Sequence, residues 1–87
     1  MPPPFQARYS HQFLSDLRKL DPPVQRRILE AIETKLLVDP FKHGKKLVGK
    51  IGPGRWRFRV GDYRVRFDIE GSTLLFYRVR HRHEIYD

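Results

Sequence analysis

The sequence predicts an α+β fold in which a hairpin of two helices covers one face of a small, mainly antiparallel, twisted sheet. Three observations support this prediction: helical spacing of apolar residues up to position 39, apolar–polar alternation after position 55, and short glycine turns between the alternating segments. The expected order is strand, helix, helix, strand, strand, strand. Because the chain has 87 residues, we expect a single domain over residues 1–87, with the helices covering the apolar face of the sheet.

The first element is expected to be a short strand. Phe5, Ala7 and Tyr9 alternate with polar residues, which is the period of a strand with one buried face. Three prolines precede this segment, and proline donates no hydrogen bond to a sheet. We therefore expect the segment at an edge of the sheet or at the start of a strand.

Two helices should follow, separated by a short joint near Asp21. Ser10 can cap the first helix, whose apolar residues fall at helical spacing: Phe13, Leu14, Leu17 and Leu20. Asp21 can cap the second helix, because the two prolines after it fit the first helical turn. This second helix should end at Asp39-Pro40, and its apolar stripe has a helical period: Val24, Ile28, Ala31, Ile32 and Leu36.

A surface loop and a three-stranded meander complete the predicted fold. Residues 41–54 hold four glycines, one proline and four lysines, a composition typical of a loop. Strands are expected at 55–60, 63–69 and 73–80, because glycine-containing turns separate these alternating segments. The inward face of the last strand is ambiguous, since Leu74 and Phe76 compete with a second apolar set: Leu75, Tyr77 and Val79.

The charge of the chain is large and unevenly distributed. The formal net charge is +8, and residues 42–87 carry twelve bases and five acids, against six bases and five acids in residues 1–41. The basic half should therefore contact an anionic partner. Charge alone does not tell whether this partner is a nucleic acid, a membrane surface or an acidic protein. There is no cysteine and no apolar run near the ~20 residues of a membrane span. We expect a cytoplasmic protein without disulfides, membrane segment or secretory signal.

Arginines dominate the segment from Arg55 to Arg82, which holds eight of them, no lysine and three acids. The alternation of these arginines with apolar residues places several guanidiniums on one side of the sheet. Like charges this close repel one another unless an anion lies among them, and a phosphate backbone is one such anion. A solvated sheet face without function is the alternative explanation of the same pattern.

In three segments the sequence resembles the RelE/ParE superfamily of toxins from toxin–antitoxin pairs. These segments are 47–49 (Leu-Val-Gly), 56–65 (Trp-Arg-Phe-Arg-Val-Gly-Asp-Tyr-Arg-Val) and 81–86 (His-Arg-His-Glu-Ile-Tyr). The resemblance implies a RelE-like fold, with the helix hairpin on one face of the sheet. It also implies one of two activities, because RelE-like members cut messenger RNA on the ribosome and ParE-like members act on DNA gyrase.

The resemblance also assigns site residues by position. RelE-like members use basic residues on the middle strands, an arginine late in the last strand and a tyrosine near the C-terminus. By position, these correspond to Arg55, Arg57, Arg64, Arg80 and Tyr86. The best-known members carry lysines where Arg55 and Arg57 stand, and they continue into a further helix after the position of Tyr86. For the RelE-like branch the resemblance implies an endoribonuclease. We expect neither a metal site nor a cofactor, because the four histidines, without cysteine and with scattered acids, show no metal-ligand spacing.

RNA cleavage needs the 2′-OH deprotonated, the phosphorane stabilised and the 5′-oxygen protonated. Arginine binds two phosphate oxygens at once but stays charged, so it suits only the second task. We expect Arg64 and Arg80 to hold the transition state, assisted by Arg57, and His83 and Tyr86 to transfer protons, because histidine titrates near neutrality. Further RNA contacts are expected from Arg55, Arg59, Arg66, Arg82, His81, Lys45, Lys46 and Lys50.

The expected partners are mRNA, the ribosome and an acidic antitoxin that lays a helix or strand across the basic and apolar surfaces. The free toxin should be monomeric and should form a hetero-oligomer with its antitoxin. Two alternatives remain open at this stage. One is a ParE-like toxin that poisons gyrase without nuclease activity, and the other is an inactive member that only binds RNA or antitoxin.

Overall fold

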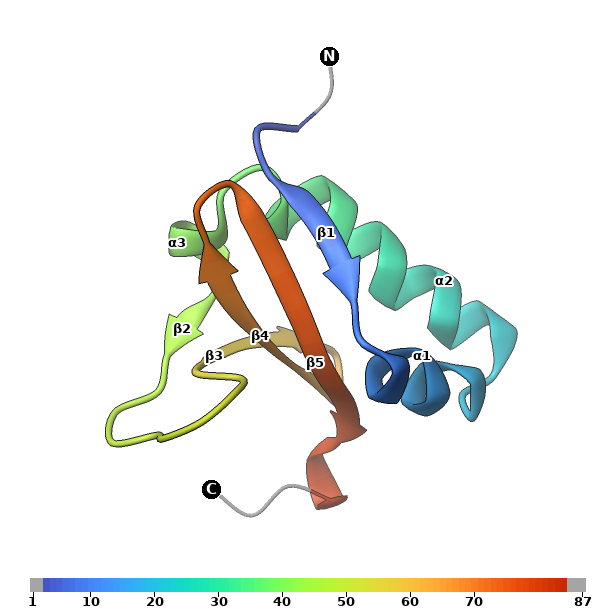
Figure 1. Cartoon of the computed structure of the whole chain (residues 1–87). Coiled ribbons are helices and arrows are strands. Elements are labelled where there is room, and N and C mark those ends of the chain that lie inside the picture. Colours follow the sequence, from blue (N-terminus) through green and yellow to red (C-terminus); the bar gives the residue numbers. More distant parts are fainter. Residues whose placement is uncertain (1–2, 85–87) are drawn as a thin grey trace.

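A computed structural model describes residues 3–84 of the chain (Figure 1). Its first half contains one strand and a run of helical segments: β1 (Gln6–Tyr9), α1 (His11–Arg18), α2 (Pro22–Ala31), the π-helical turn η1 (Ile32–Leu36) and α3 (Pro40–His43). The second half contains the other strands and a final 3-10 turn: β2 (Lys45–Lys46), β3 (Trp56–Val60), β4 (Tyr63–Glu70), β5 (Thr73–His81) and η2 (Arg82–Glu84).

The sheet confirms the predicted fold class and adds its strand order, β1-β5-β4-β3-β2. Strand β1 runs parallel to β5, and the other three pairs are antiparallel. Helices α1 and α2 lie together on one side of the sheet (Figure 1), where α1 packs on β5 and α2 contacts β3. In the part of the chain that the structure describes, no helix is long and apolar enough to cross a membrane.

The core lies between the two helices and the inward face of the meander. Phe13, Ile28, Ile32 and Leu36 are fully buried on the helix side, at the helical spacing that the sequence shows. On the sheet side the core comprises Phe58, Val60, Val65, Phe67, Leu74, Phe76 and Val79. Burial of these side chains supplies the main driving force for a chain of this size.

Two expectations for the helical half were wrong in detail. The second helix does not continue in α-helical form to Asp39, because its last turn is the π-helical η1. The segment 41–54 is not wholly a loop, because it begins within α3 and includes β2. Helix α3 forms because Pro40 fits its first turn and Asp39 Oδ1 accepts a hydrogen bond from Lys42 N at 3.1 Å. Helix α3 and strand β2 are both too short to show a period in the sequence.

A β-bulge explains the ambiguous apolar pattern of the last strand. Phe76 pairs with Phe67 and Arg78 pairs with Arg66, so Tyr77 is an extra residue on β5. The bulge shifts the alternation by one position. Leu74, Phe76 and Val79 are therefore all buried although they do not follow one strict period of two.

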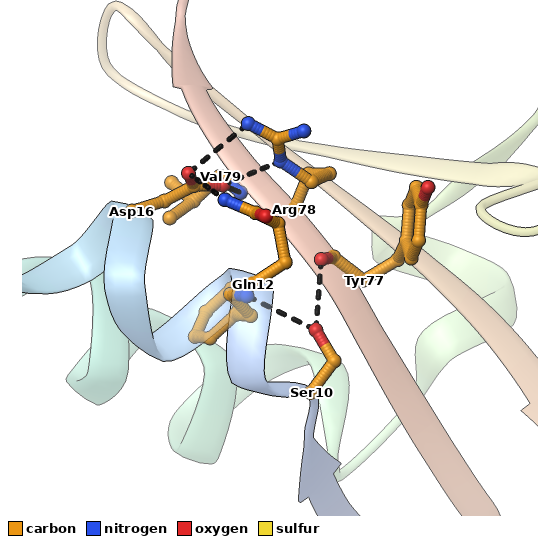
Figure 2. Close-up of polar contacts among 7 residues, drawn as sticks. Ser10, Gln12, Asp16, Tyr77, Arg78 and Val79 are labelled. Carbon is orange, nitrogen blue, oxygen red and sulfur yellow. Dashed lines mark hydrogen bonds and ion pairs between the residues drawn. The ribbon is translucent and has the colours of Figure 1, made fainter.

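An ion pair joins α1 to β5 just after the point where β1 ends (Figure 2). Asp16 Oδ2 accepts hydrogen bonds from Arg78 Nε at 2.8 Å and from Val79 N at 3.2 Å, and Arg78 Nη2 donates to Asp16 Oδ1 at 3.1 Å. Gln12 Nε2 adds a fourth hydrogen bond, to Asp16 Oδ1 at 3.1 Å. The side chain of Asp16 is only 7% exposed, so these donors replace the water it has lost.

The same contacts set the protonation of Asp16. Burial raises the pKa of this carboxyl, but the hydrogen bonds from Arg78, Gln12 and Val79 together with the charge of Arg78 outweigh burial, so the pKa is lowered. A carboxyl whose pKa is lower in the folded state stabilises the fold above its unfolded pKa, near 3.9. That stabilisation is lost as the pH falls through the folded pKa.

We predict that Asp16→Asn lowers the free energy of unfolding at pH 7 by about 2 kcal/mol, because it removes the charge from four hydrogen bonds. The difference from wild type should begin to shrink as the pH falls below the unfolded pKa near 3.9, where the unfolded parent protein takes up a proton at Asp16. It should disappear as the pH falls through the lower folded pKa. Urea unfolding at several pH values measures this effect. Asp21→Asn is the matched control, because Asp21 is exposed and its side chain makes no capping hydrogen bond. Equal unfolding midpoints for the two variants at pH 7 would contradict the assigned role.

Candidate functional site

Arginines from three adjacent strands lie side by side on the face of the sheet opposite the core. Arg64 on β4 pairs directly with Arg59 on β3 and with Arg80 on β5. One step along the strands, Arg66 pairs with Arg57 and with Arg78. Neighbouring strands are about 5 Å apart, so the two rows bring the six guanidinium-bearing residues into one patch.

Arg64 is the centre of this patch. Its Nη1 donates to the carbonyl oxygens of Gly61 and Tyr63, both at 3.3 Å, which keeps the side chain near the β3–β4 turn. Partial burial lowers the pKa of Arg64, and the charges of Arg59, Arg57 and Arg82 lower it further, while Asp62 opposes them. Arginine remains protonated despite such a shift, so Arg64 keeps its charge beside three other arginines.

Arg82 joins the patch from the 3-10 turn after β5. Its backbone N donates to Asp62 O at 2.7 Å, and its Nη1 lies 3.7 Å from Asp62 Oδ1. These contacts hold the start of η2 against the β3–β4 turn. We call the resulting cluster the arginine surface: Arg57, Arg59, Arg64, Arg80 and Arg82.

Arg66 and Arg78 pair with each other across β4 and β5, but each side chain is bound by another group of the protein. Arg66 is 9% exposed and its Nη1 donates to Gly54 O at 3.1 Å. Arg78 is bound to Asp16. The sequence predicts that Arg66 contacts RNA, but its burial limits that contact and its hydrogen bond to Gly54 positions the start of β3.

Asp68 fixes the entry into β3. Its two carboxylate oxygens accept hydrogen bonds from Gly54 N at 2.7 Å and from Arg55 N at 2.8 Å. With Arg66, it anchors the chain at Gly54 and leaves the side chain of Arg55 exposed. Sequence reasoning did not assign Asp68, although an acid at an outward position among alternating arginines was a signal that it binds something specific.

The predicted lysines lie toward the β2 side of the sheet. Lys45 and Lys46 form β2, where Lys45 pairs with Arg57 and Lys46 pairs with Trp56. Lys50 is in the segment between β2 and β3, and all three lysines are exposed. The positive surface therefore extends from the arginine surface across β3 to the edge strand.

The two histidines of the predicted site contact each other at the end of β5. The rings of His81 and His83 stack with centroids 4.9 Å apart, and His83 N donates to His81 Nδ1 at 3.3 Å. His81 is half-buried and pairs with Tyr63, whose ring meets it edge-on at 5.3 Å. His83 is exposed three residues after Arg80. Tyr86, the other predicted proton-transfer residue, lies outside the described residues.

Residues 3–84 contain no cluster of side chains suited to bind a metal ion. No three histidine, aspartate or glutamate side chains there lie close enough together to hold an ion. The described site brings together clustered guanidiniums, which bind anions, and the two stacked imidazoles.

Comparison with known proteins identifies the family. The family model for the ParE toxin of the type II toxin–antitoxin system parDE matches residues 7–86. This chain belongs to the RelE/ParE toxin family. The toxin is similar to Toxin RelE3 of Methanocaldococcus jannaschii, with 34% identity over 91% of this chain and 92% of that protein. It is also similar to Toxin RelG of Mycobacterium tuberculosis, with 33% identity over 95% of this chain and 97% of that protein.

Solved structures of related toxins share its fold. The toxin–antitoxin complex RelBE2 from Mycobacterium tuberculosis contains a chain with a TM-score of 0.82 and 30% identity, over 91% of this toxin and 99% of that chain. The RelE–RelB complex from Pyrococcus horikoshii contains one with a TM-score of 0.72 and 25% identity, over 94% of this toxin and 99% of that chain. These similarities confirm the predicted family.

We predict that Arg64→Gln makes the toxin slightly more stable at low salt. The substitution removes repulsion from Arg57, Arg59 and Arg82, and interactions between exposed charges amount to roughly 0.5 kcal/mol. The gain should disappear near 1 M salt, where charges are screened over about 3 Å. Urea unfolding at low and high salt tests this, with Arg18→Gln as the control because Arg18 is exposed at the end of α1. Equal loss of stability in both variants would show that crowding does not destabilise the arginine surface.

Proposed function

We propose that this toxin is a ribosome-dependent endoribonuclease that cleaves mRNA and thereby inhibits translation. The observation that carries the proposal is the direct pairing of Arg59, Arg64 and Arg80 across three strands. Within residues 3–84, no ion pair to a carboxylate is formed by these three guanidiniums. A phosphodiester placed among them would receive several charge-assisted hydrogen bonds from groups already in position.

The cleavage step would proceed by attack of the ribose 2′-oxygen on the adjacent phosphorus. A bond from O2′ to phosphorus forms and the bond from phosphorus to O5′ breaks, which leaves a 2′,3′-cyclic phosphate and a free 5′-hydroxyl. Arg64 and Arg80 would bind the non-bridging oxygens as negative charge grows on them, with Arg57 assisting. His83 and Tyr86 would take the proton from O2′ and deliver one to O5′.

The remaining basic residues would hold the RNA strand and orient the site. Arg59, Arg82 and Arg55 would bind neighbouring phosphates, and the three exposed lysines would extend this contact across β2. His81 would act on RNA mainly through His83, which it contacts. Arg66 would act by fixing Gly54 and the start of β3.

We predict that Arg64→Ala slows cleavage of ribosome-bound mRNA by about 10²–10³-fold, the usual cost of removing one well-placed charge stabiliser. Primer extension on programmed ribosomes with purified toxin locates and times the cuts. Arg18→Ala, which removes an exposed arginine from α1, should cleave like wild type. Wild-type cleavage by Arg64→Ala at equal concentration would remove Arg64 from the mechanism.

The same assay tests the proton-transfer residues. Single-turnover cleavage is measured for His83→Ala and Tyr86→Phe across pH 5 to 9, since loss of a proton-transfer group changes the pH profile as well as the rate. If neither variant is slowed at least tenfold, neither side chain carries the proton transfer.

Gyrase is the second candidate target, because the matching family model is described as a ParE toxin. A gyrase poison needs a binding surface but no proton-transfer groups. A supercoiling assay with DNA gyrase distinguishes the two activities. Inhibition of gyrase together with intact ribosome-bound mRNA would replace the nuclease proposal with the ParE-like one.

An acidic antitoxin is the proposed partner in the cell, where the toxin would act on cytoplasmic ribosomes. The related RelBE2 and RelE–RelB structures are toxin–antitoxin complexes, and the net charge of +8 favours association with an anionic protein. We predict that the free toxin is a monomer and that the antitoxin covers Arg64 or Arg80. The association rate should fall steeply with salt in stopped-flow measurements. A crystal structure of the complex with both arginines open to solvent would contradict direct neutralisation of the site.

A further inference from the structure

Tyr77 is an exposed aromatic side chain in the middle of the sheet. It is 39% exposed and belongs to the bulge of β5, three residues before Arg80. The other large apolar side chains that are exposed in the described part of the chain lie outside the strands: Val38, Phe41, Val48 and Ile51.

The bulge places Tyr77 on the same face as the arginine surface. Tyr77 and Arg78 together oppose Arg66, so neither residue needs to point into the core. The position of Gly54 confirms this face. A Cβ at Gly54 would lie 3.1 Å from Arg66 Cβ and 3.3 Å from Tyr77 Cδ2, so the ring of Tyr77 lies beside the stem of Arg66.

The backbone around the ring is anchored before any ligand binds. Gly54 can approach the ring closely because it has no side chain, and its φ of +79° is one that favours glycine. Asp68 and Arg66 hold Gly54 by hydrogen bonds to its N and O. Ser10 Oγ donates to Tyr77 O at 3.0 Å (Figure 2). Because the backbone on both sides is anchored, less conformational entropy is lost there on binding.

The same face stays open beyond Tyr77. A hollow begins at Leu75, two residues earlier on β5, and runs toward the segment before β3. Its lining includes Gly52, Pro53, Arg55, Asp68, Glu70 and Leu75. This hollow lies next to Tyr77 along β5 and is lined by both basic and acidic side chains.

We propose that Tyr77 is a stacking platform for a base of the RNA strand, next to the phosphate bound by the arginine surface. The inference rests on the proposed nuclease function and adds a base contact to it. Single-stranded RNA is commonly bound by phosphate-neutralising cations together with aromatic rings on which bases stack. The arginine surface supplies the cations, and Tyr77 supplies an aromatic ring on the same face.

The test measures binding of fluorescently labelled toxin to programmed ribosomes. The cleavage codon carries 2′-deoxyriboses, which removes the attacking hydroxyl, and in a second series one base at a time is replaced by an abasic unit. Tyr77→Leu keeps an apolar side chain without an aromatic ring, and Tyr77→Phe keeps the ring. Phe41→Leu is the matched control, because Phe41 is an aromatic residue of α3 that is 62% exposed.

We expect Tyr77→Leu to weaken binding about tenfold, since stacking contributes roughly 1–3 kcal/mol per base. Tyr77→Phe and Phe41→Leu should bind within about twofold of wild type. At one codon position, removal of the base should weaken binding of the wild-type toxin. Removal of the same base should not weaken binding of Tyr77→Leu any further, because the ring with which the base interacts is already absent. Equal weakening by Tyr77→Leu on the intact message and on every abasic message would overturn the stacking role.

The all-ribose message separates this inference from the function it rests on. Cleavage by wild-type toxin without any coupling between Tyr77 and a base would refute the stacking platform alone. Absence of both cleavage and binding with wild-type toxin would refute the nuclease proposal, and the stacking role with it. Weaker binding of purified antitoxin to Tyr77→Leu, without base coupling on the ribosome, would assign Tyr77 to a protein interface and so also overturn the proposal.

Discussion

The carboxylate of Asp16 is the interaction on which the geometry of the arginine-bearing face depends. Strand β1 ends at Tyr9, and beyond it β5 has no strand neighbour on that side. Helix α1 takes that place, and Asp16 binds both the guanidinium of Arg78 and the backbone N of Val79. The contact fixes β5 just after its bulge, and so fixes the direction of Arg80 and the chain leading to His83.

The two faces of the sheet are under opposite physical constraints. The inward face gains stability from burial of aromatic and aliphatic side chains. The outward face holds like charges close together, and after burial the charges of Arg59, Arg57 and Arg82 also lower the pKa of Arg64. A protein selected for stability alone would not keep this arrangement, whereas a site for a polyanion needs guanidiniums in fixed positions before the ligand arrives. The core therefore offsets the cost of the site.

Much of the fold could be predicted because its signals are periodic and local. The apolar stripes of α1 and α2, the Ser10 cap and the strands of the meander all follow from spacing of residues in the sequence. Contacts between distant segments were not predictable in the same way. The bulge at Tyr77 arises from pairing between β4 and β5, and the bonds of Asp16 to Arg78 and of Asp68 to Gly54 join residues that no local pattern connects. For the same reason alternation placed Arg59, Arg64 and Arg80 on one face but could not show that Arg66 is buried and tethered.

The parallel pairing of β1 with β5 has a consequence for biosynthesis. Residues Gln6 to Tyr9 have their strand partners at Thr73 to Phe76, so β1 must wait during synthesis until β5 has been made. Non-local pairing of this kind delays folding, because the intervening chain has to be closed into a loop first. The sheet that aligns the arginines is thus completed only after β5 has been made. A nascent copy without β5 would still lack the assembled arginine surface.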